Sequence, residues 1–514
     1  MNKIKFLILL IGLTSLVSCD SMLEQEVNPN RQDSSNFWKT EQELRDGLNA
    51  AYRPLRFNGG YRRWLHILYV SRSDEGYSTS PNTTFQSYSN FNTLNNDGCE
   101  AVLFTWLDLY KGIFWANQVL EHQNVQLENP DDMDEIMGQA YFLRGIGLFN
   151  IAGVYGRGPT PLASDLGDNY PIYEQKEIYQ QAQRDFDEAR KRLPVTWSSD
   201  ADLGRITKGG ALGMLAKVSA QLHEWDNVKN YCDSIFSLGV YELVANYNDN
   251  FTEANENNSE SLFEVQFMPG PISGVRDPSQ ERAKFLGLPA NGQSYDDATA
   301  SNIVRADLEK ERTQNNQVDP RLKHTLFYHD PADNTLYYGR TFNSWANAGT
   351  VDRSKVYWKK YTQWDTKTEG NAESHDNNGI NFRVVRLADI YLLYAEALNE
   401  LGRTSDAYEY INKVRRRVNL RDLENSTVFT GIGNDQTKMR EQIMHERSCE
   451  LAGESWRWFD LERWGMFESR DKIDWLAGRD YEFENFVIGK SNRFPIPYRE
   501  IPLVPGLEQN PGYN

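Results

Sequence analysis

The sequence predicts a mainly α-helical protein in which about four tetratricopeptide-like helical hairpins form a scaffold. An irregular, loop-rich insertion carries a few short strands. Three observations predict this fold class. Apolar residues recur at helical spacing before residue 240 and after residue 380, small residues recur at fixed offsets, and the region between shows no sustained period. With 39% hydrophobic and 12% aromatic residues, the 514-residue chain has enough apolar material for a packed core.

The N-terminal segment has the features of an export signal. Two lysines precede the uncharged apolar segment 6–13, which is far shorter than the roughly 20 residues that a membrane-spanning helix needs. Small and apolar residues then lead into Cys19, as they do before the lipidated cysteine of bacterial lipoproteins. We therefore predict a lipoprotein signal peptide at 1–18, lipidation of Cys19 and a lipid-anchored tether at 19–35. The alternative is an ordinary cleaved signal with a chance cysteine.

Helices are predicted throughout the next region, 36–240. Segments 109–120 and 139–154 have the pattern of one helix pair. Segment 177–193 is a further helix, which we expect to pair with 208–222. Such pairs predict a solenoid in which each unit buries its apolar face against the next.

The clearest hairpin is predicted between residues 386 and 418. The apolar side chains of 386–398 fall on one stripe, and Gly402 follows where a left-handed C-cap is expected. A second helix begins near Ser405 and has three arginines near its negative end. The repeat positions of this hairpin are Ala395, Leu398, Gly402, Ala407, Ile411 and Val414. The same offsets recur at Ala216, Ser219, His223, Val228, Cys232 and Ile235, with His223 in place of the turn glycine.

Charge and cysteine content exclude several classes of protein. A net charge of -18 opposes binding to nucleic acid and adsorption to anionic lipid, because both depend on clustered Lys and Arg. A mean hydropathy of -0.67 predicts no further membrane span. Once Cys19 is lipidated, only Cys99, Cys232 and Cys449 remain, so no disulfide framework is expected.

Polar segments in both halves of the chain carry more aromatic residues than ordinary loops. Segment 77–96 is rich in Ser, Thr and Asn, and 340–381 has a similar composition. Sugar rings pack on aromatic faces while polar side chains bond their hydroxyls, so these rings are candidates for glycan binding. The candidates are Tyr77, Phe85, Tyr88, Tyr295, Trp345 and Trp364. Core packing or loop anchoring is the alternative for each of them.

Opposite charges alternate at helical spacing between residues 446 and 463. The charged residues are Glu446, Arg447, Glu450, Glu454, Arg457, Asp460 and Arg463. We interpret them as an ion-pair network between two helices, not as a glycosidase carboxylate pair, because each acid has an arginine nearby. No metal-ligand spacing, phosphate-binding loop or nucleophile motif appears, so we predict neither catalysis nor a cofactor.

The C-terminal half carries motifs that resemble the SusD/RagB family. They are RLADIYLLYAEALNE at 386–400, INKVR at 411–415, ER at 446–447, ELAGE at 450–454 and RW at 457–458. The chain end is also similar, with FPIP at 494–497 and QNPGY at 509–513, and SDE at 73–75 fits the N-terminal half. The resemblance covers nearly the whole chain. It implies a SusD-like N-terminal region at 36–240 and a C-terminal region at 241–514, divided into loop-rich 241–380, helical 381–470 and a Pro-rich end.

This resemblance implies a surface lipoprotein of the outer membrane that captures a nutrient, usually a glycan. It also implies a partner, a SusC-like TonB-dependent β-barrel transporter, on which the protein sits as a lid with its tetratricopeptide side toward the barrel. Asp74 falls in a family loop near the ligand. We therefore predict a non-enzymatic glycan-binding subunit. The alternatives are a peptide-capturing uptake protein of the same family and an envelope hydrolase.

Overall fold

The computed structural model describes residues 37–93, 98–167, 169–270, 279–289, 297–365 and 378–513. The signal peptide, Cys19 and the tether predicted from the sequence lie outside this part of the chain, as does Tyr295. Among the described residues, no helix combines the length and the apolar character that crossing a membrane requires.

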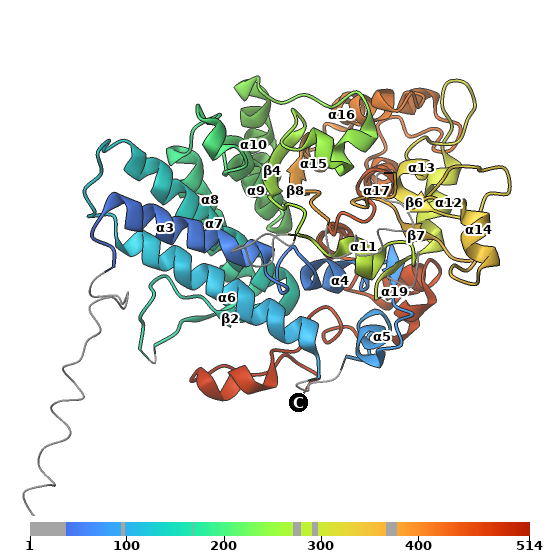
Figure 1. Ribbon diagram of the computed structural model, residues 1–514. Coiled ribbons are helices and arrows are strands. Elements are labelled where there is room, and N and C mark those ends of the chain that lie inside the picture. The colour runs from blue at the N-terminus through green and yellow to red at the C-terminus, as the bar shows by residue number, and fades with distance from the viewer. Residues whose placement is uncertain are drawn as a thin grey trace, which may run out of the picture.

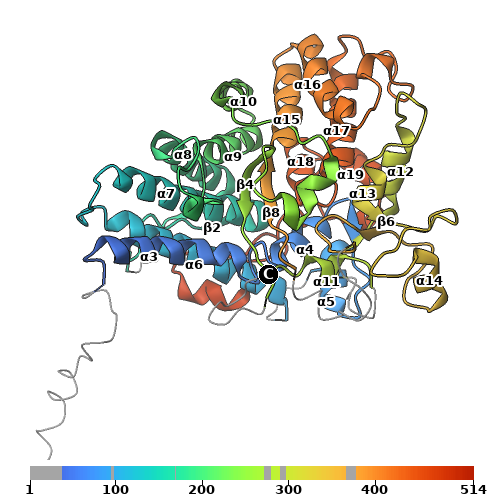
Figure 2. The same cartoon turned by 45° about the horizontal axis from the view of Figure 1, so that its top comes forward.

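Long helices packed side by side form a stack that runs across the molecule (Figures 1 and 2). They are α3 (Glu41–Tyr52), α6 (Glu100–Glu121), α7 (Asp132–Tyr155), α8 (Gln175–Arg192), α9 (Lys208–Gln221), α10 (Trp225–Leu238), α15 (Leu387–Glu400), α16 (Thr404–Arg417) and α17 (Gln436–Leu451). Consecutive helices contact each other along the series α6, α7, α8, α9 and α10. The series continues through α15, which contacts α10, α16 and α17. The stack of hairpins predicted from the sequence is therefore confirmed, and it continues across the insertion that separates α10 from α15.

Small side chains allow neighbouring helices of the stack to approach closely. A Cβ atom at Gly145 of α7 would lie 2.8 Å from a ring carbon of Phe186 on α8. Ala182 and Ala189 are fully buried on the same face of α8. Because close-packed interiors leave little free space, a larger side chain at Gly145 would push these helices apart.

The two hairpins with matching offsets use the same kind of turn. Gly402, after α15, has φ of 74°, as expected for a left-handed C-cap. His223, between α9 and α10, has φ of 59° although it carries a side chain. The histidine therefore adopts the backbone conformation of the glycine that it replaces.

The strands are short and form four antiparallel two-stranded sheets within the described residues. They are β1 (Gly76–Tyr77) with β5 (Thr299–Ala300), β2 (Arg157–Pro159) with β3 (Ile172–Glu174), β4 (Ser261–Val265) with β8 (Phe382–Arg386), and β6 (Leu326–Phe327) with β7 (Tyr357–Trp358). The β4–β8 pair joins the start of the insertion to the residues just before α15. The insertion therefore leaves and re-enters the stack at one place.

Shorter helices complete the fold. They are α4 (Trp64–Val70), α5 (Thr83–Ser89), α11 (Arg282–Leu286), α12 (Asn302–Lys310), α13 (Leu322–Thr325), α14 (Phe342–Asn347), α18 (Arg457–Arg463) and α19 (Arg470–Ala477), with 3-10 turns η1 (Arg53–Arg56), η2 (Asp200–Asp202), η3 (Tyr247–Phe251), η4 (Glu253–Asn255), η7 (Leu423–Asn425), η8 (Tyr481–Asn485) and η9 (Tyr498–Leu503). The C-terminal segment returns to the stack, where the Phe494 N–H donates to the Val154 carbonyl at 3.0 Å. Its last turn, η9, lies beneath α6 in Figure 1.

A buried ion-pair network joins the C-terminal helices to the insertion. Arg386, 1% exposed, contacts the carboxylates of Glu260 and Glu450 at 2.8 and 2.6 Å, and Glu454 at 2.8 Å. Further pairs are Arg447 with Asp389 and Asp460, Arg463 with Glu396 and Asp460, Arg415 with Glu311 and Glu446, and Arg321 with Asp319, Glu446 and Glu450. The predicted ion pairing is confirmed, but the network extends well beyond two helices.

Candidate ligand-binding site

The loop-rich insertion has a small aromatic core of its own. Its buried members are Leu288, Phe327, Tyr337, Tyr338, Phe342, Trp345, Ala346, Val351 and Tyr357, and Trp364 packs against them. The ring centroids of Phe327 and Tyr337 lie 5.0 Å apart in an edge-to-face arrangement. The Trp345 Nε1–H donates to the Tyr337 carbonyl at 2.8 Å. These contacts hold the polar loops of the insertion in one shape.

Trp364 marks the place where this aromatic core reaches the surface. Its half-buried ring meets Tyr337 edge to face at 5.4 Å, and Lys359 Nζ lies 3.9 Å from the ring centroid. Burial lowers the pKa of Lys359 to about 8. The Tyr337 hydroxyl donates to Asp333 at 2.6 Å. Trp364 and Asp333 are both half-buried at the rim, whereas Lys359 is buried and packs against the Trp364 ring. The rim therefore offers an aromatic face and a carboxylate, which suit a polar ligand with flat apolar faces.

A chain of two-residue strands connects this insertion to the loop that carries Tyr77. Tyr77 of β1 pairs with Thr299 of β5, and β5 contacts β7. Lys355 Nζ, from the insertion, donates to Thr79 Oγ1 at 3.0 Å. The described parts of the segments 77–96 and 340–381 are therefore brought to the same side of the molecule, and Tyr77 is half-buried there.

Three of the rings predicted to bind glycan are buried. They serve core packing, which was the alternative interpretation of each. Phe85 (6% exposed) stacks on Trp64 at 5.4 Å, and Tyr88 (0%) meets Phe494 edge to face at 5.5 Å. Trp345 (1%) belongs to the core of the insertion. Polar loop composition suggested exposure for these rings, but contacts with distant segments bury them. Tyr77 and Trp364 stay predictions for ligand contact.

Asp74 is also buried, where it binds two arginines. Its carboxylate contacts Arg457 through Nε at 2.7 Å and through Nη2 at 2.8 Å, and it contacts Arg479 Nε at 2.6 Å. Burial opposes ionisation, but the two guanidinium charges hold the pKa of Asp74 well below its usual range. Asp74 therefore positions arginines and does not itself face solvent.

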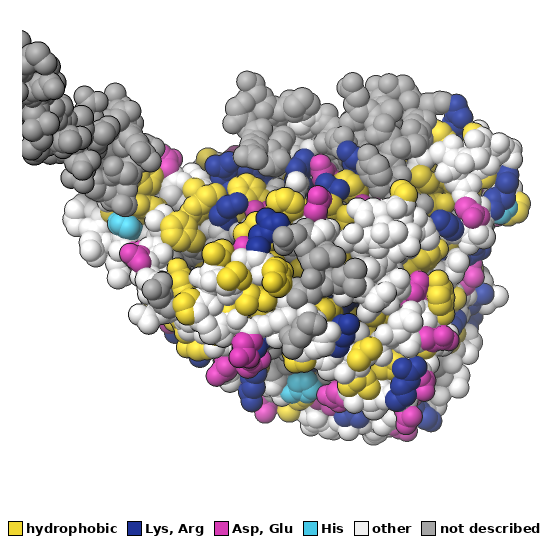
Figure 3. Space-filling model, turned by 90° about the horizontal axis from the view of Figure 1, so that it is seen from below, with side chains coloured by type: hydrophobic (Ala, Val, Ile, Leu, Met, Phe, Trp, Pro, Cys, Tyr) yellow, Lys and Arg dark blue, Asp and Glu magenta, His cyan; other side chains and the backbone are white. Residues whose placement is uncertain are grey.

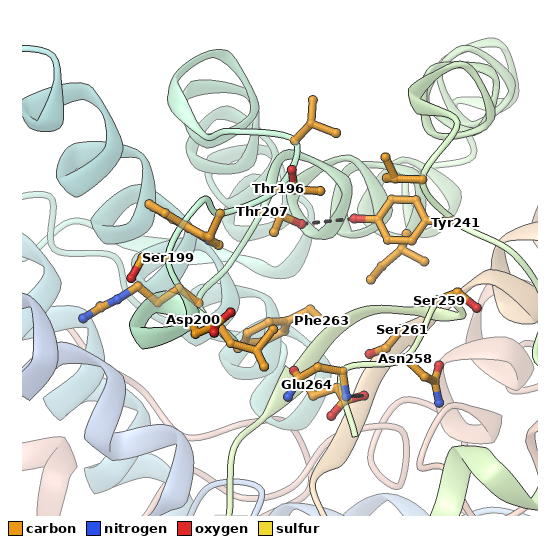
Figure 4. Close-up of a pocket in the computed structure, with 18 residues that line it drawn as sticks. Thr196, Ser199, Asp200, Thr207, Tyr241, Asn258, Ser259, Ser261, Phe263 and Glu264 are labelled. Carbon is orange, nitrogen blue, oxygen red and sulfur yellow. Dashed lines mark hydrogen bonds between the residues drawn. The ribbon is translucent and has the colours of Figure 1, made fainter. Parts of the chain in front are cut away.

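Among the pockets of the described residues, two that lie outside the aromatic rim could hold a ligand. One has a volume of about 260 Å³ and lies between the α8–α9 connection, Tyr241 and β4. Figure 4 shows Thr207 and Tyr241, joined by a 3.1 Å hydrogen bond, above Phe263 and Glu264 of β4. The other has a volume of about 560 Å³ and a more apolar lining, with Phe429, Met444, Met466 and Trp475. We call it the α19 pocket.

A stack of helical hairpins whose surface carries aromatic and polar pockets defines a scaffold of the ligand-binding class. A family model described as "SusD family" matches residues 237–513, more than half of the chain, and a second, "Starch-binding associating with outer membrane", matches residues 23–219. The chain belongs to the SusD/RagB family, as its motifs predicted.

Its relatives span nearly the whole chain. SusD-like protein P25 of Formosa agariphila is 26% identical over all of this chain and 99% of its own length. A SusD superfamily protein from Bacteroides vulgatus superposes with a TM-score of 0.78 at 25% identity, covering 93% of this chain and 100% of its own. A laminarin-binding SusD-like protein superposes with a TM-score of 0.73 at 23% identity, covering 92% and 100%.

The α19 pocket was missed from the sequence, although its tryptophan gave a signal. Ile473 and Leu476 of α19 are fully buried and define the inner face of this helix. Trp475 lies between them in sequence, about 100° from Leu476 around the helix, so it points away from that face. An aromatic residue on the outer side of an amphipathic helix indicates a surface role.

Proposed function

We propose that the protein is a non-enzymatic glycan-binding lipoprotein of the outer membrane surface, which delivers its ligand to a TonB-dependent transporter. Membership of the SusD/RagB family carries this proposal. It is supported by the description of the second matching family, starch-binding and associated with the outer membrane, and by a laminarin-binding structural relative. The aromatic rim around Trp364 is the proposed glycan contact.

The rim suits a neutral or weakly polar polysaccharide for a physical reason. Trp364 and Tyr77 are half-buried, so each offers part of a ring while the rest is fixed by packing. Fixed rings lose little conformational entropy when a sugar stacks on them. Asp333, which is also half-buried, then supplies an acceptor for hydroxyl groups.

A protein partner is supported by apolar side chains exposed on the lower face of the stack. Phe104 (41% exposed) and Phe114 (40%) lie on α6, and Tyr498 (63%) and Leu503 (69%) lie on η9. Figure 3 views this face and shows hydrophobic side chains gathered among charged ones. We propose this surface as the contact with the transporter, because exposed apolar groups of this kind mark interaction sites.

Affinity electrophoresis tests the glycan proposal. The purified protein is run in native gels that contain laminarin, starch or another neutral polysaccharide, and retardation is measured. The double variant Trp364→Ala with Tyr77→Ala should weaken retention about thirtyfold, because each of the two stacked rings contributes about 1 kcal/mol beyond its buried area. Leu336→Ala is the matched control, since Leu336 is exposed in the same insertion.

The same experiment separates the other functions. Release of reducing ends from the polysaccharide would identify a hydrolase. Retention of peptides without retention of any glycan would identify a peptide-binding protein. Unchanged mobility of the double variant, with the wild type retarded, would remove Trp364 and Tyr77 from the site.

A further inference from the structure

Trp475 is the tryptophan of this chain that the fold leaves exposed. The sequence has 13 tryptophans, all of them within the described residues, and Trp475 alone among them is largely exposed, at 46%. The other tryptophans are buried or half-buried in packed clusters. Leaving an indole ring in water forgoes the free energy of burying it, so a ring that lines a pocket is a candidate for covering by a ligand.

The pocket beside Trp475 has the size and walls of a small-ligand site. Its volume of about 560 Å³ falls within the range of roughly 300–1,000 Å³ that is typical of such sites. Most of its residues come from α12, α17, α18 and α19, which lie together on one side of the molecule in Figures 1 and 2. Phe429, Met466 and Arg479 come from the loops beside these helices. Phe429, Met444 and Met466 form apolar wall with the indole. Several rigid elements therefore fix its shape.

Both arginines and Lys310 in the lining of this pocket already have carboxylate partners. Arg479 contacts Asp74 at 2.6 Å and Asp307 at 2.7 Å, and Lys310 contacts Asp307 at 2.8 Å. Arg457 contacts Asp74 at 2.7 Å. An anionic ligand would have to compete with these carboxylates for the same guanidinium and ammonium groups.

Two other carboxylates at the pocket have no cationic partner among the described residues. Glu441 of α17 and Asp471 of α19 line it, and in the described part of the chain neither forms an ion pair or a side-chain hydrogen bond. They are available to accept hydrogen bonds from hydroxyl groups. A cationic ligand would meet Arg479, Lys310 and other positive side chains of the same pocket, so the charges favour a neutral ligand with hydroxyl donors.

We propose that the α19 pocket is a second carbohydrate-binding site, which takes a neutral sugar unit stacked on Trp475 and hydrogen-bonded to Glu441 and Asp471. The proposal rests on the glycan-binding function proposed above and adds a site separate from the Trp364 rim. Asp74 acts in this site as a positioning residue, since it holds Arg457 and Arg479 in the pocket wall. One polysaccharide chain in contact with both sites would be held more tightly than by either site alone.

Trp475→Ala tests the proposal in the full-length purified protein. Retention in laminarin or starch gels should fall about five- to tenfold, because the stacked ring is removed. Tyr481→Ala is the matched control, since Tyr481 is an exposed aromatic residue (69%) just beyond α19 and does not line the pocket. Its retention should equal that of the wild type. Glu441→Gln with Asp471→Asn should also weaken retention while leaving the indole in place.

Tryptophan fluorescence gives a second readout. Titration with laminarin oligosaccharides should shift the emission of the wild type to the blue as Trp475 is covered, and most of this shift should be absent in Trp475→Ala. An unchanged retention and an unchanged shift in this variant would overturn the pocket site. If Trp364→Ala with Tyr77→Ala still lost retention, the proposed function itself would stand.

The remaining outcomes are also decisive. Failure of the wild type to bind any glycan would remove both the proposed function and this site. Trp475-dependent retention by the anionic polysaccharide alginate, with none by laminarin or starch, would overturn the assignment of a neutral ligand. Loss of a co-purifying barrel in Trp475→Ala, with unchanged glycan retention, would show that the pocket binds protein.

Discussion

Among the described residues, Glu75 is a buried carboxylate without an arginine partner, unlike the adjacent Asp74. It is 2% exposed and follows Asp74 directly, yet both arginines bind Asp74. Glu75 Oε2 accepts a hydrogen bond from the Gly453 N–H at 3.2 Å. Burial raises the pKa of Glu75 from 4.5 to about 8. Two adjacent acids therefore differ in charge at neutral pH, Asp74 ionised and Glu75 protonated.

The raised pKa of Glu75 predicts a pH-dependent loss of folding stability, which the substitution Glu75→Gln should remove. Between pH 4.5 and 8 the folded state binds a proton that the unfolded state releases, so stability falls as pH rises through this window. The variant should gain about 3 kcal/mol of unfolding free energy near pH 7 and almost none at pH 4.5. Urea denaturation at both pH values measures the difference. Glu484→Gln, at an exposed position, is the control. An equal gain at both pH values would contradict the prediction.

At the scale of elements, the repeat pattern was readable because it depends on local sequence. Side chains three and four residues apart share a helix face, so the apolar stripe of α15 and the turn at Gly402 followed from spacing alone. The roles of the aromatic loop residues could not be predicted in this way. Tyr88 and Trp345 are buried by residues distant in sequence, which spacing does not identify. Trp475 was not singled out either, because the predicted helical part ended at residue 470 and α19 (Arg470–Ala477) lies beyond it.

The two matching turns provide a prediction at this scale. His223 keeps a φ of 59° that glycine adopts without steric cost, whereas a residue with Cβ pays roughly 1 kcal/mol there. His223→Gly should therefore raise or leave unchanged the unfolding free energy, with a gain of up to about 1 kcal/mol. Gly402→Ala, in open space at φ of 74°, should lower it by about 1 kcal/mol.

Thermal denaturation of both variants measures these changes. Gly239→Ala after α10 is a useful comparison, because Gly239 also has a positive φ (68°) and open space around it. It should behave like Gly402→Ala. Destabilisation by His223→Gly that matches the loss in Gly402→Ala would show that the imidazole, and not the backbone, stabilises the first turn.

For the whole molecule, the buried charges connect parts of the chain that the repeats alone leave separate. Arg457 lies 383 residues from Asp74, and Arg386 joins the insertion residue Glu260 to α17. Removing one partner of such a pair leaves an uncompensated buried charge, which typically costs 3–5 kcal/mol. The sequence indicated that the charges between 446 and 463 pair, but their distant partners depend on the assembled fold. The network makes the stack and the insertion one unit, so the proposed carbohydrate sites keep a fixed separation.

The predicted lipid anchor would set where this unit works, and Cys19→Ala tests that prediction. Acyl chains on Cys19 would hold the body at the membrane, since each buried CH₂ contributes about 0.8 kcal/mol and several chains act together. The variant should move from the membrane fraction to the soluble fraction, as measured by immunoblotting of fractionated cells. Because the substitution changes no residue between 37 and 513, the purified variant should retain laminarin or starch as the wild type does. Ser21→Ala, in the same predicted tether, should stay with the membrane. Membrane retention of Cys19→Ala would place the anchor elsewhere.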